Sequence, residues 1–318
     1  MKKILITGVA GFIGFSIANN FLKKNYKVIG IDNFDNYYSS KYKNKKIKIL
    51  KKNKKFVFFK IDISNFKKVS KIVNLKKIDI VIHMAAQAGV RYSLINPNKY
   101  IDSNILGFTS LIKSIKNSNV KKFIYASSSS VYGDSKKFPL RETNKLKPKN
   151  IYALSKKINE EIAEEYSSLS STKFIGLRFF TIYGEWGRPD MFLFKMFKAS
   201  KLNENFYLNN FGNHLRDFTY IGDVNKIIQR LIDKKIKKHE IFNICSNSPI
   251  NINEIVNKFK KNNKLNVKLI KQHKADVIKT HGDNKKIKKF LNLDKFSKFE
   301  DNINKIFEWY KYNKIQKL

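Results

Sequence analysis

A tyrosine and a lysine four positions apart, Tyr152 and Lys156, have a spacing that suits acid–base chemistry. Positions i and i+4 of a helix share one face, so the ammonium can lie near the phenol. A free tyrosine has a pKa of about 10, and nearby positive charge would lower it enough for the phenolate to act as a general base. The alternative is an ordinary exposed tyrosine and lysine, because lysine is abundant in this chain.

A run of serines earlier in the chain favours the chemical interpretation. Ser127, Ser128, Ser129 and Ser130 end an apolar segment that reads as a strand. The carboxyl end of a strand in a parallel sheet faces the ligand cleft, where a serine hydroxyl can share a substrate proton with Tyr152. A serine-rich loop without a chemical role is the alternative.

Glycines near the N-terminus predict a second chemical feature, a phosphate-binding turn. Gly8, Gly11 and Gly14 lie between an apolar segment and an amphipathic run. Such a turn lets a pyrophosphate approach main-chain amides at the positive end of a helix, although this spacing differs from the commonest fingerprint. Asp32 ends the next apolar segment, where a carboxylate accepts hydrogen bonds from an adenosine ribose and repels a 2′-phosphate. The pattern predicts a dinucleotide site that prefers NAD to NADP.

The elements that must position these residues alternate between strands and helices. Further apolar segments typical of buried strands span residues 56–61, 78–84, 123–126 and 174–177, and residues 101–115 have a helical period. This alternation predicts an α/β fold, a Rossmann-like doubly wound parallel sheet with a smaller C-terminal α/β substrate lobe.

The alternation loosens after about residue 180. We expect the Rossmann domain to comprise residues 1–180 and 217–247, and the substrate lobe to comprise residues 181–216 and 248–318. A helical run at 224–232 and a strand at 241–244 would then return to the main sheet. The lysine-rich stretch at 41–55 is expected to be a surface insertion.

The composition bears on whether the protein binds nucleic acid. The formal charge of the 318 residues is +40, but 59 of the 65 basic residues are lysines, and 36 residues are asparagines. We interpret this as a compositional bias with solvated lysines, so we expect no nucleic-acid partner. The few arginines are then of interest, because a planar guanidinium has a geometry that lysine lacks. They include Arg91, Arg178, Arg188 and Arg216.

The single cysteine, Cys245, cannot form an internal disulfide, and no cysteine metal site is expected. No apolar run is long enough to span a bilayer, and no signal peptide is evident. These features predict a cytoplasmic protein without a metal ion.

Three motifs together resemble the extended short-chain dehydrogenase/reductase family of nucleotide-sugar enzymes. They are the glycine turn with Phe12 and Ile13, the serine run followed by Val131-Tyr132-Gly133, and the Tyr152/Lys156 pair. Within this family, residues 32–38, 85–93, 178–191 and 216–221 are similar to bacterial UDP-glucuronate 4-epimerases. The similarity spans roughly residues 2–295.

The resemblance implies an enzyme that retains NAD and interconverts UDP-glucuronate and UDP-galacturonate through a transient 4-keto sugar. Tyr152 would take the proton of the 4-hydroxyl while hydride passes to the nicotinamide, whose charge, with that of Lys156, would lower the tyrosine pKa. It also implies a homodimer built on the helices near 101–115 and 152–166.

The resemblance also implies a set of site residues. The catalytic residues would be Tyr152, Lys156, Ser128 and Ser129. The cofactor would be held by Gly8, Gly11, Phe12, Ile13, Gly14, Asp32, Asn33, Asp62, Ile63, Ala85, Ala86, Gln87, Asn104, Tyr152 and Lys156. The UDP-sugar would be held by Arg91, Ser128, Thr181, Arg188, Arg216 and Asp276, with Thr181 and Arg188 on the sugar carboxylate.

Other functions remain open. The same keto intermediate is a β-keto acid, so a decarboxylase is one alternative, and a UDP-glucose-type epimerase is another. A non-catalytic NAD-binding module is a third. For the two residues assigned to the sugar carboxylate, the alternative is that Arg188 only forms an ion pair with Glu185 or Asp190 and that Thr181 is an ordinary strand-end hydroxyl. Two departures from the family pattern bear on these alternatives. The family's usual Gln-Pro-Gly-Asp near the uridine is replaced by residues 273–276. The Asp-Glu pair that the dehydratases use as acid and base is replaced by Ser129 and Ser130, so elimination of water from the sugar is not expected.

Overall fold

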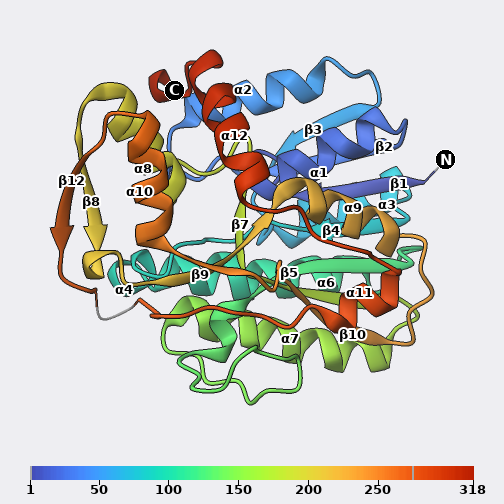
Figure 1. Ribbon diagram of the computed structural model, residues 1–318. Helices are drawn as coiled ribbons and strands as arrows, with labels where there is room; N and C mark the ends of the chain where they lie inside the picture. Colours follow the sequence, from blue (N-terminus) through green and yellow to red (C-terminus); the bar gives the residue numbers. More distant parts are fainter. Residues whose placement is uncertain (1, 274–275) are drawn as a thin grey trace.

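A seven-stranded parallel sheet forms the centre of the protein, which we describe from a computed structural model over residues 2–273 and 276–318 (Figure 1). The strand order is β10-β6-β5-β4-β1-β2-β3. The bounds are β1 (Lys3–Thr7), β2 (Lys27–Asp32), β3 (Phe56–Lys60), β4 (Ile80–His83), β5 (Lys122–Ser128), β6 (Lys173–Phe179) and β10 (His239–Ile244). The order reverses between β1 and β4, which is where doubly wound sheets bind ligands. The predicted fold class is confirmed.

The inner strands of this sheet carry apolar side chains on both faces, because helices cover both. On β1, Ile4 and Ile6 belong to one buried cluster while Leu5 belongs to the other. The first face is covered by α1 (Phe12–Lys23), α2 (Ser40–Lys51) and α9 (Ile221–Leu231). The second face is covered by α3 (Phe66–Lys76), α6 (Gly107–Ile115) and α7 (Ile151–Leu169). Burial on both sides explains the continuous apolar segments of the sequence.

The later part of the chain adds two small sheets and four helices among the described residues. The sheets comprise β7 (Thr181–Tyr183), β9 (Leu215–Tyr220) and β11 (Pro249–Asn251), and β8 (Asn205–Asn209) with β12 (Asn266–Ile270). The helices are α8 (Phe192–Leu202), α10 (Ile252–Asn262), α11 (Lys285–Leu291) and α12 (Glu300–Tyr312). Figure 1 shows α8, β8, α10 and β12 gathered at the left of the view. The strand predicted at 241–244 lies within β10 and joins the main sheet, while the division into lobes stays a proposal.

Short helices complete the fold. They are α4 (Tyr92–Ile95), α5 (Asn98–Tyr100), the π-helix η1 (Ile101–Leu106) and the 3₁₀ turns η2 (Ser129–Tyr132), η3 (Asn210–Gly212) and η4 (Ile315–Lys317). Between residues 2 and 318, leaving aside 274 and 275, no helix has the length and apolar character needed to cross a membrane.

The expected surface insertion at 41–55 is wrong, because most of this stretch forms α2 and packs into the core. Tyr42 and Leu50 are fully buried, and so is Lys46. The ammonium of Lys46 lies 4.6 Å from the centre of the Tyr42 ring, and burial lowers the pKa of Lys46 to about 7. A lysine at a buried helix position is rare, so the lysine-rich composition concealed an amphipathic helix.

Candidate active site

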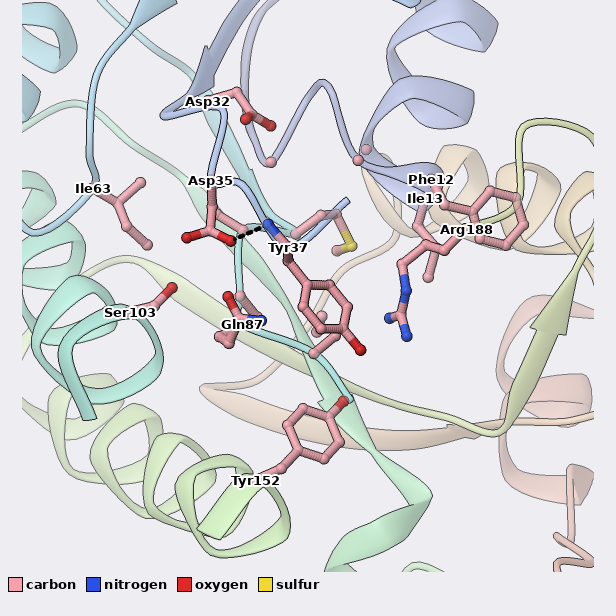
Figure 2. Close-up of a pocket in the computed structure, with 18 of the residues that line it drawn as sticks. Phe12, Ile13, Asp32, Asp35, Tyr37, Ile63, Gln87, Ser103, Tyr152 and Arg188 are labelled. Carbon is pink, nitrogen blue, oxygen red and sulfur yellow. Dashed lines mark hydrogen bonds between the residues drawn. The ribbon is translucent and has the colours of Figure 1, made fainter. Parts of the chain in front are cut away.

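A cavity of about 550 Å³ opens at the carboxyl ends of β1, β2, β4, β5 and β6. Many of the residues predicted from the sequence line it (Figure 2). These are Gly8, Gly11, Phe12, Ile13, Gly14, Asp32, Asn33, Asp62, Ile63, Ala85, Ala86, Gln87, Ser128, Tyr152, Lys156, Thr181 and Arg188. Residues from distant parts of the sequence thus share one wall, as expected at the switch point of such a sheet.

Glycine is required at two positions of the turn from β1 into the first turn of α1. Gly8 has a φ of +68°, and a methyl group there would lie 2.6 Å from the main-chain nitrogen of Ala85. A methyl group on Gly14 would lie 2.2 Å from the carbonyl oxygen of Gly8. Gly11 occupies the N-cap of α1, so the amides that begin this helix border the cavity. This arrangement suits a pyrophosphate.

The Asp32 carboxylate is fixed at the end of β2 by two main-chain donors. It accepts hydrogen bonds from the amides of Ala10 and Phe34, each at 2.9 Å. Burial raises the pKa of Asp32, against the effect of these hydrogen bonds and of nearby lysines. Asp62 also lines the cavity, and its carboxylate accepts a hydrogen bond from the side-chain amide of Asn33 at 2.7 Å. Together these oxygens offer the acceptors that an adenosine ribose requires.

Tyr152 lies in the first turn of α7, facing Ser128 at the end of β5. Burial raises the pKa of Tyr152, while a hydrogen bond with the Ser128 side chain and the charge of Arg188 oppose this shift. Lys156 is buried, donates to the carbonyl oxygen of Ala126 at 2.8 Å, and has its pKa lowered to about 8 by burial. The predicted lowering of the tyrosine pKa includes the charge of a bound oxidised nicotinamide, so it stays a prediction; the protein groups alone leave the effect of burial dominant.

Ser129 and Asn104 lie outside the described wall of the cavity. Ser129 begins the η2 turn. Asn104 is buried in the π-helix η1, accepts from the amide of Gln87 at 2.7 Å, and donates to Ser155 on α7 at 3.0 Å. Asn104 therefore ties the cavity wall at Gln87 to the helix that carries Tyr152, and irregular π turns often occur at such positions.

Arg188 lines the cavity and forms a two-pronged ion pair with Asp190. Its Nε and Nη2 atoms donate to the two carboxylate oxygens at 2.9 and 2.8 Å. The Tyr37 hydroxyl donates to the same carboxylate at 3.1 Å. The ion pair named as an alternative for Arg188 thus exists, but it lies in the wall that also contains Thr181 and Tyr152.

Arg91, Arg216 and Asp276 form a separate cluster beyond this wall. Arg91 binds Asp276 through Nε and Nη2 at 3.1 and 2.7 Å. Arg216 donates to the carbonyl oxygens of Leu215 and Ile278, and burial lowers its pKa to about 10 against the attraction of Asp276. Residues 274 and 275, within the segment that departs from the family pattern, lie outside the described residues.

Arg178 belongs to a buried ion-pair network. It binds both oxygens of Glu160 at 2.9 and 2.8 Å, and both side chains are buried. Ser127 donates to Glu160 as well. This network braces the end of β5 against α7, directly beside Ser128.

Sequence analysis missed several residues of the cavity wall, notably Tyr37, Lys43, Lys99 and Ser103. Tyr37 belongs to the segment at 32–38, whose similarity to the epimerases was the available signal. Lys43 and Lys99 carried no signal, because lysine is so frequent in this chain.

Comparisons with known proteins agree with this geometry. The model of the NAD dependent epimerase/dehydratase family matches residues 4–245. Protein MJ1055 of Methanocaldococcus jannaschii is 41% identical over 319 residues, which cover 98% of this chain and 97% of that protein. The UDP-glucuronate 4-epimerase of Thermodesulfobacterium geofontis is 37% identical over 317 residues, covering 98% and 97%.

A solved structure extends the comparison to three dimensions. The UDP-glucuronic acid 4-epimerase of Bacillus cereus, in complex with UDP-glucuronic acid and NAD, superimposes with a TM-score of 0.92 at 30% identity. The match covers 98% of this chain and 99% of the other.

Proposed function

The chain belongs to the NAD dependent epimerase/dehydratase family, whose cofactor is NAD, and we propose that it interconverts UDP-glucuronate and UDP-galacturonate. The observation that carries this proposal is the position of Arg188. Its guanidinium lines the same cavity as Tyr152 and Ser128, where it can recognise a sugar carboxylate. The whole-length similarity to UDP-glucuronate 4-epimerases supports the same substrate.

The residues present fit NAD. The glycine turn leaves no room for side chains beside the start of α1, and Asp32 and Asp62 present carboxylate oxygens in the same cavity wall. Asp32 would hold the adenosine ribose, and the amides of Phe12 and Ile13 would face the pyrophosphate. When bound, NAD supplies the hydride acceptor for the sugar.

Tyr152 is proposed as the group that removes the proton of the 4-hydroxyl and later returns it. Ser128 lines the same cavity beside the phenol and can bond the same substrate oxygen. Lys156 is positioned by the carbonyl of Ala126, and its buried ammonium favours the phenolate form of a neighbouring tyrosine. Arg188 and Thr181 would hold the sugar carboxylate, which restrains the bond that decarboxylation must break.

The uridine diphosphate would extend beyond the cavity toward Arg91, Arg216 and Asp276. Arg91 and Asp276 already bind each other, so either side chain could exchange its partner for the nucleotide. Arg216 retains a positive charge suited to a diphosphate.

We also propose a homodimer, as the resemblance predicts. Exposed apolar side chains lie on α7 and on α4 and η1, both of which pack against α7. They are Leu94, Ile95, Ile101, Leu106 and Leu154. The exposed fraction of Ile95 is 78%, which a second copy of the chain would cover. Ile95→Glu should shift the protein to monomers in sedimentation, whereas Leu202→Glu on α8 should not.

The test of the proposed reaction is incubation of the purified protein with UDP-glucuronate and no added reductant. Proton NMR should show UDP-galacturonate. Release of carbon dioxide instead would identify a decarboxylase. Conversion of UDP-glucose at a similar rate would favour the neutral-sugar epimerase, and the absence of any turnover would favour the non-catalytic module.

A further inference from the structure

Asp190 holds the arginine that the sugar carboxylate is proposed to bind. Its two carboxylate oxygens accept hydrogen bonds from the Nε and Nη2 atoms of Arg188. Tyr37, from the loop after β2, donates to one of these oxygens from across the cavity. Figure 2 shows the Tyr37 ring reaching between Asp35 and Arg188, with its hydroxyl toward the space above Tyr152. Arg188 therefore has an internal carboxylate partner next to the reacting site.

The pair is more sheltered than an ordinary surface ion pair. The side chains of Arg188 and Asp190 are 24% and 29% exposed. Burial acts to raise the pKa of Asp190, but the charge and hydrogen bonds of Arg188 and the hydroxyl of Tyr37 lower it below the usual value. Asp190 is thus an anion at neutral pH, and it neutralises the arginine.

A second carboxylate on Arg188 changes this charge balance. A guanidinium has five N–H groups, and Asp190 uses one edge of it. A sugar carboxylate that arrives would bring two anions to one cation in a partly desolvated place, where like charges repel. A neutral sugar would leave the Arg188–Asp190 pair undisturbed. Asp190 therefore competes specifically with anionic sugars.

Epimerisation makes such competition useful. The keto sugar must present its opposite face before hydride returns, and its carboxylate moves with the ring because it is attached to carbon 5. If Arg188 had no other partner, each release would leave a charge unpaired in a partly buried site, which is costly. Asp190 lies two residues from Arg188 and already binds its Nε and Nη2 atoms, so it can pair with the arginine whenever the sugar carboxylate leaves.

We propose, on the basis of the function proposed above, that Asp190 is a positioning residue that exchanges with the sugar carboxylate on Arg188. The Asp190 carboxylate pairs with Arg188 when the carboxylate of the keto sugar dissociates. It releases Arg188 when the carboxylate of the reoriented sugar binds. Its presence weakens the binding of UDP-glucuronate and speeds the turning of the sugar.

The test compares Asp190→Asn with the wild type in two measurements. Binding is measured by calorimetry on NAD-loaded protein in a Tyr152→Phe background, which prevents turnover. Turnover is measured with Tyr152 intact. We expect the Kd for UDP-glucuronate to fall roughly threefold to tenfold, the scale of one partly screened charge interaction, while kcat falls as well. The Kd for UDP-glucose should change less than about twofold.

Tighter binding combined with slower turnover separates exchange from a merely structural role. If Asp190 only aligned Arg188, its replacement would raise Kd and lower kcat together. Asp190→Ala should act like Asp190→Asn, and Asp190→Glu, which keeps the charge, should restore both values toward those of the wild type. Asp233→Asn, which removes an exposed partner of Lys2, is the matched control.

Two results would overturn the inference in distinguishable ways. If wild-type protein fails to convert UDP-glucuronate, the proposed function fails and the exchange falls with it. If the wild type converts UDP-glucuronate but Asp190→Asn binds it no more tightly, the epimerase stands and the exchange is wrong.

Discussion

Tyr152 and Lys156 lie one helical turn apart on α7 but have different surroundings: the phenol lies in the cavity wall beside Ser128, whereas the ammonium donates to the carbonyl of Ala126. The lysine is thereby fixed before any ligand arrives. Its ammonium is also removed from solvent, since Lys156 is only 1% exposed. The geometry supports a tyrosine base that depends on a fixed cation.

Tyr152→Phe should fold and retain NAD but lose turnover by about 10² or more, because only the ionisable hydroxyl is removed. The rate of UDP-glucuronate conversion by NMR and the NAD content of the purified protein are the two measurements. Activity within a few-fold of the wild type would show that Tyr152 is not the base.

Arg188→Ala should weaken UDP-glucuronate binding by roughly tenfold or more, the scale of a lost charge-assisted pair, and affect UDP-glucose much less. Kd values for both sugars measure this. Arg141→Ala is the control, because Arg141 is largely exposed and pairs with Asp283 away from the cavity. Equal losses for both sugars would contradict the carboxylate clamp and favour a neutral-sugar epimerase.

Asp32→Asn should lower the affinity for NAD by roughly tenfold and reduce the discrimination against NADP, because the negative charge that faces the ribose is removed. Fluorescence titration with both dinucleotides measures the ratio, and thermal unfolding checks that the turn at Ala10 and Phe34 is intact. An unchanged preference for NAD would show that Asp32 does not select the cofactor.

His83 should make the fold sensitive to acid. It is buried beside Thr7, and burial, with a contribution from Lys156, lowers the pKa of His83 from 6.5 to about 3. The unfolded chain therefore binds this proton at a higher pH than the folded protein does. The free energy of unfolding should fall as the pH drops from 6.5 toward 3, by about 1.4 kcal/mol per pH unit from this residue alone.

Urea unfolding of the wild type and of His83→Gln at pH 7 and pH 4.5 measures this contribution. The variant should lose less stability between the two pH values than the wild type, by about 2.5 kcal/mol. Equal losses in the two proteins would mean that His83 is protonated in the folded state.

The parallel sheet could be predicted because its strands read as continuous apolar segments separated by helical periods. The cavity could be predicted in outline, since Gly8 follows β1 and Asp32 and Ser128 end β2 and β5, and parallel strands bring such ends together. Local sequence therefore contained this part of the site.

The partners of the arginines could not be predicted in the same way. Arg91 and Asp276 are separated by 185 positions, and their contact depends on how the later segments pack on the main sheet. The helix α2 was missed because Lys43 and Lys46 are buried by neighbouring aromatic rings, which local composition does not reveal. Long-range packing decides both features.

The edge position of β10 has a consequence for biosynthesis. This strand pairs in parallel with β6, but residues 180–238 must leave the ribosome before β10 does. During that interval the outer edge of β6 has unpaired amides and carbonyls, a surface on which nascent chains can join one another. Fragments that stop before residue 239 should therefore need a chaperone to avoid aggregation, whereas β10 pairs with this edge of β6 once it has been synthesised.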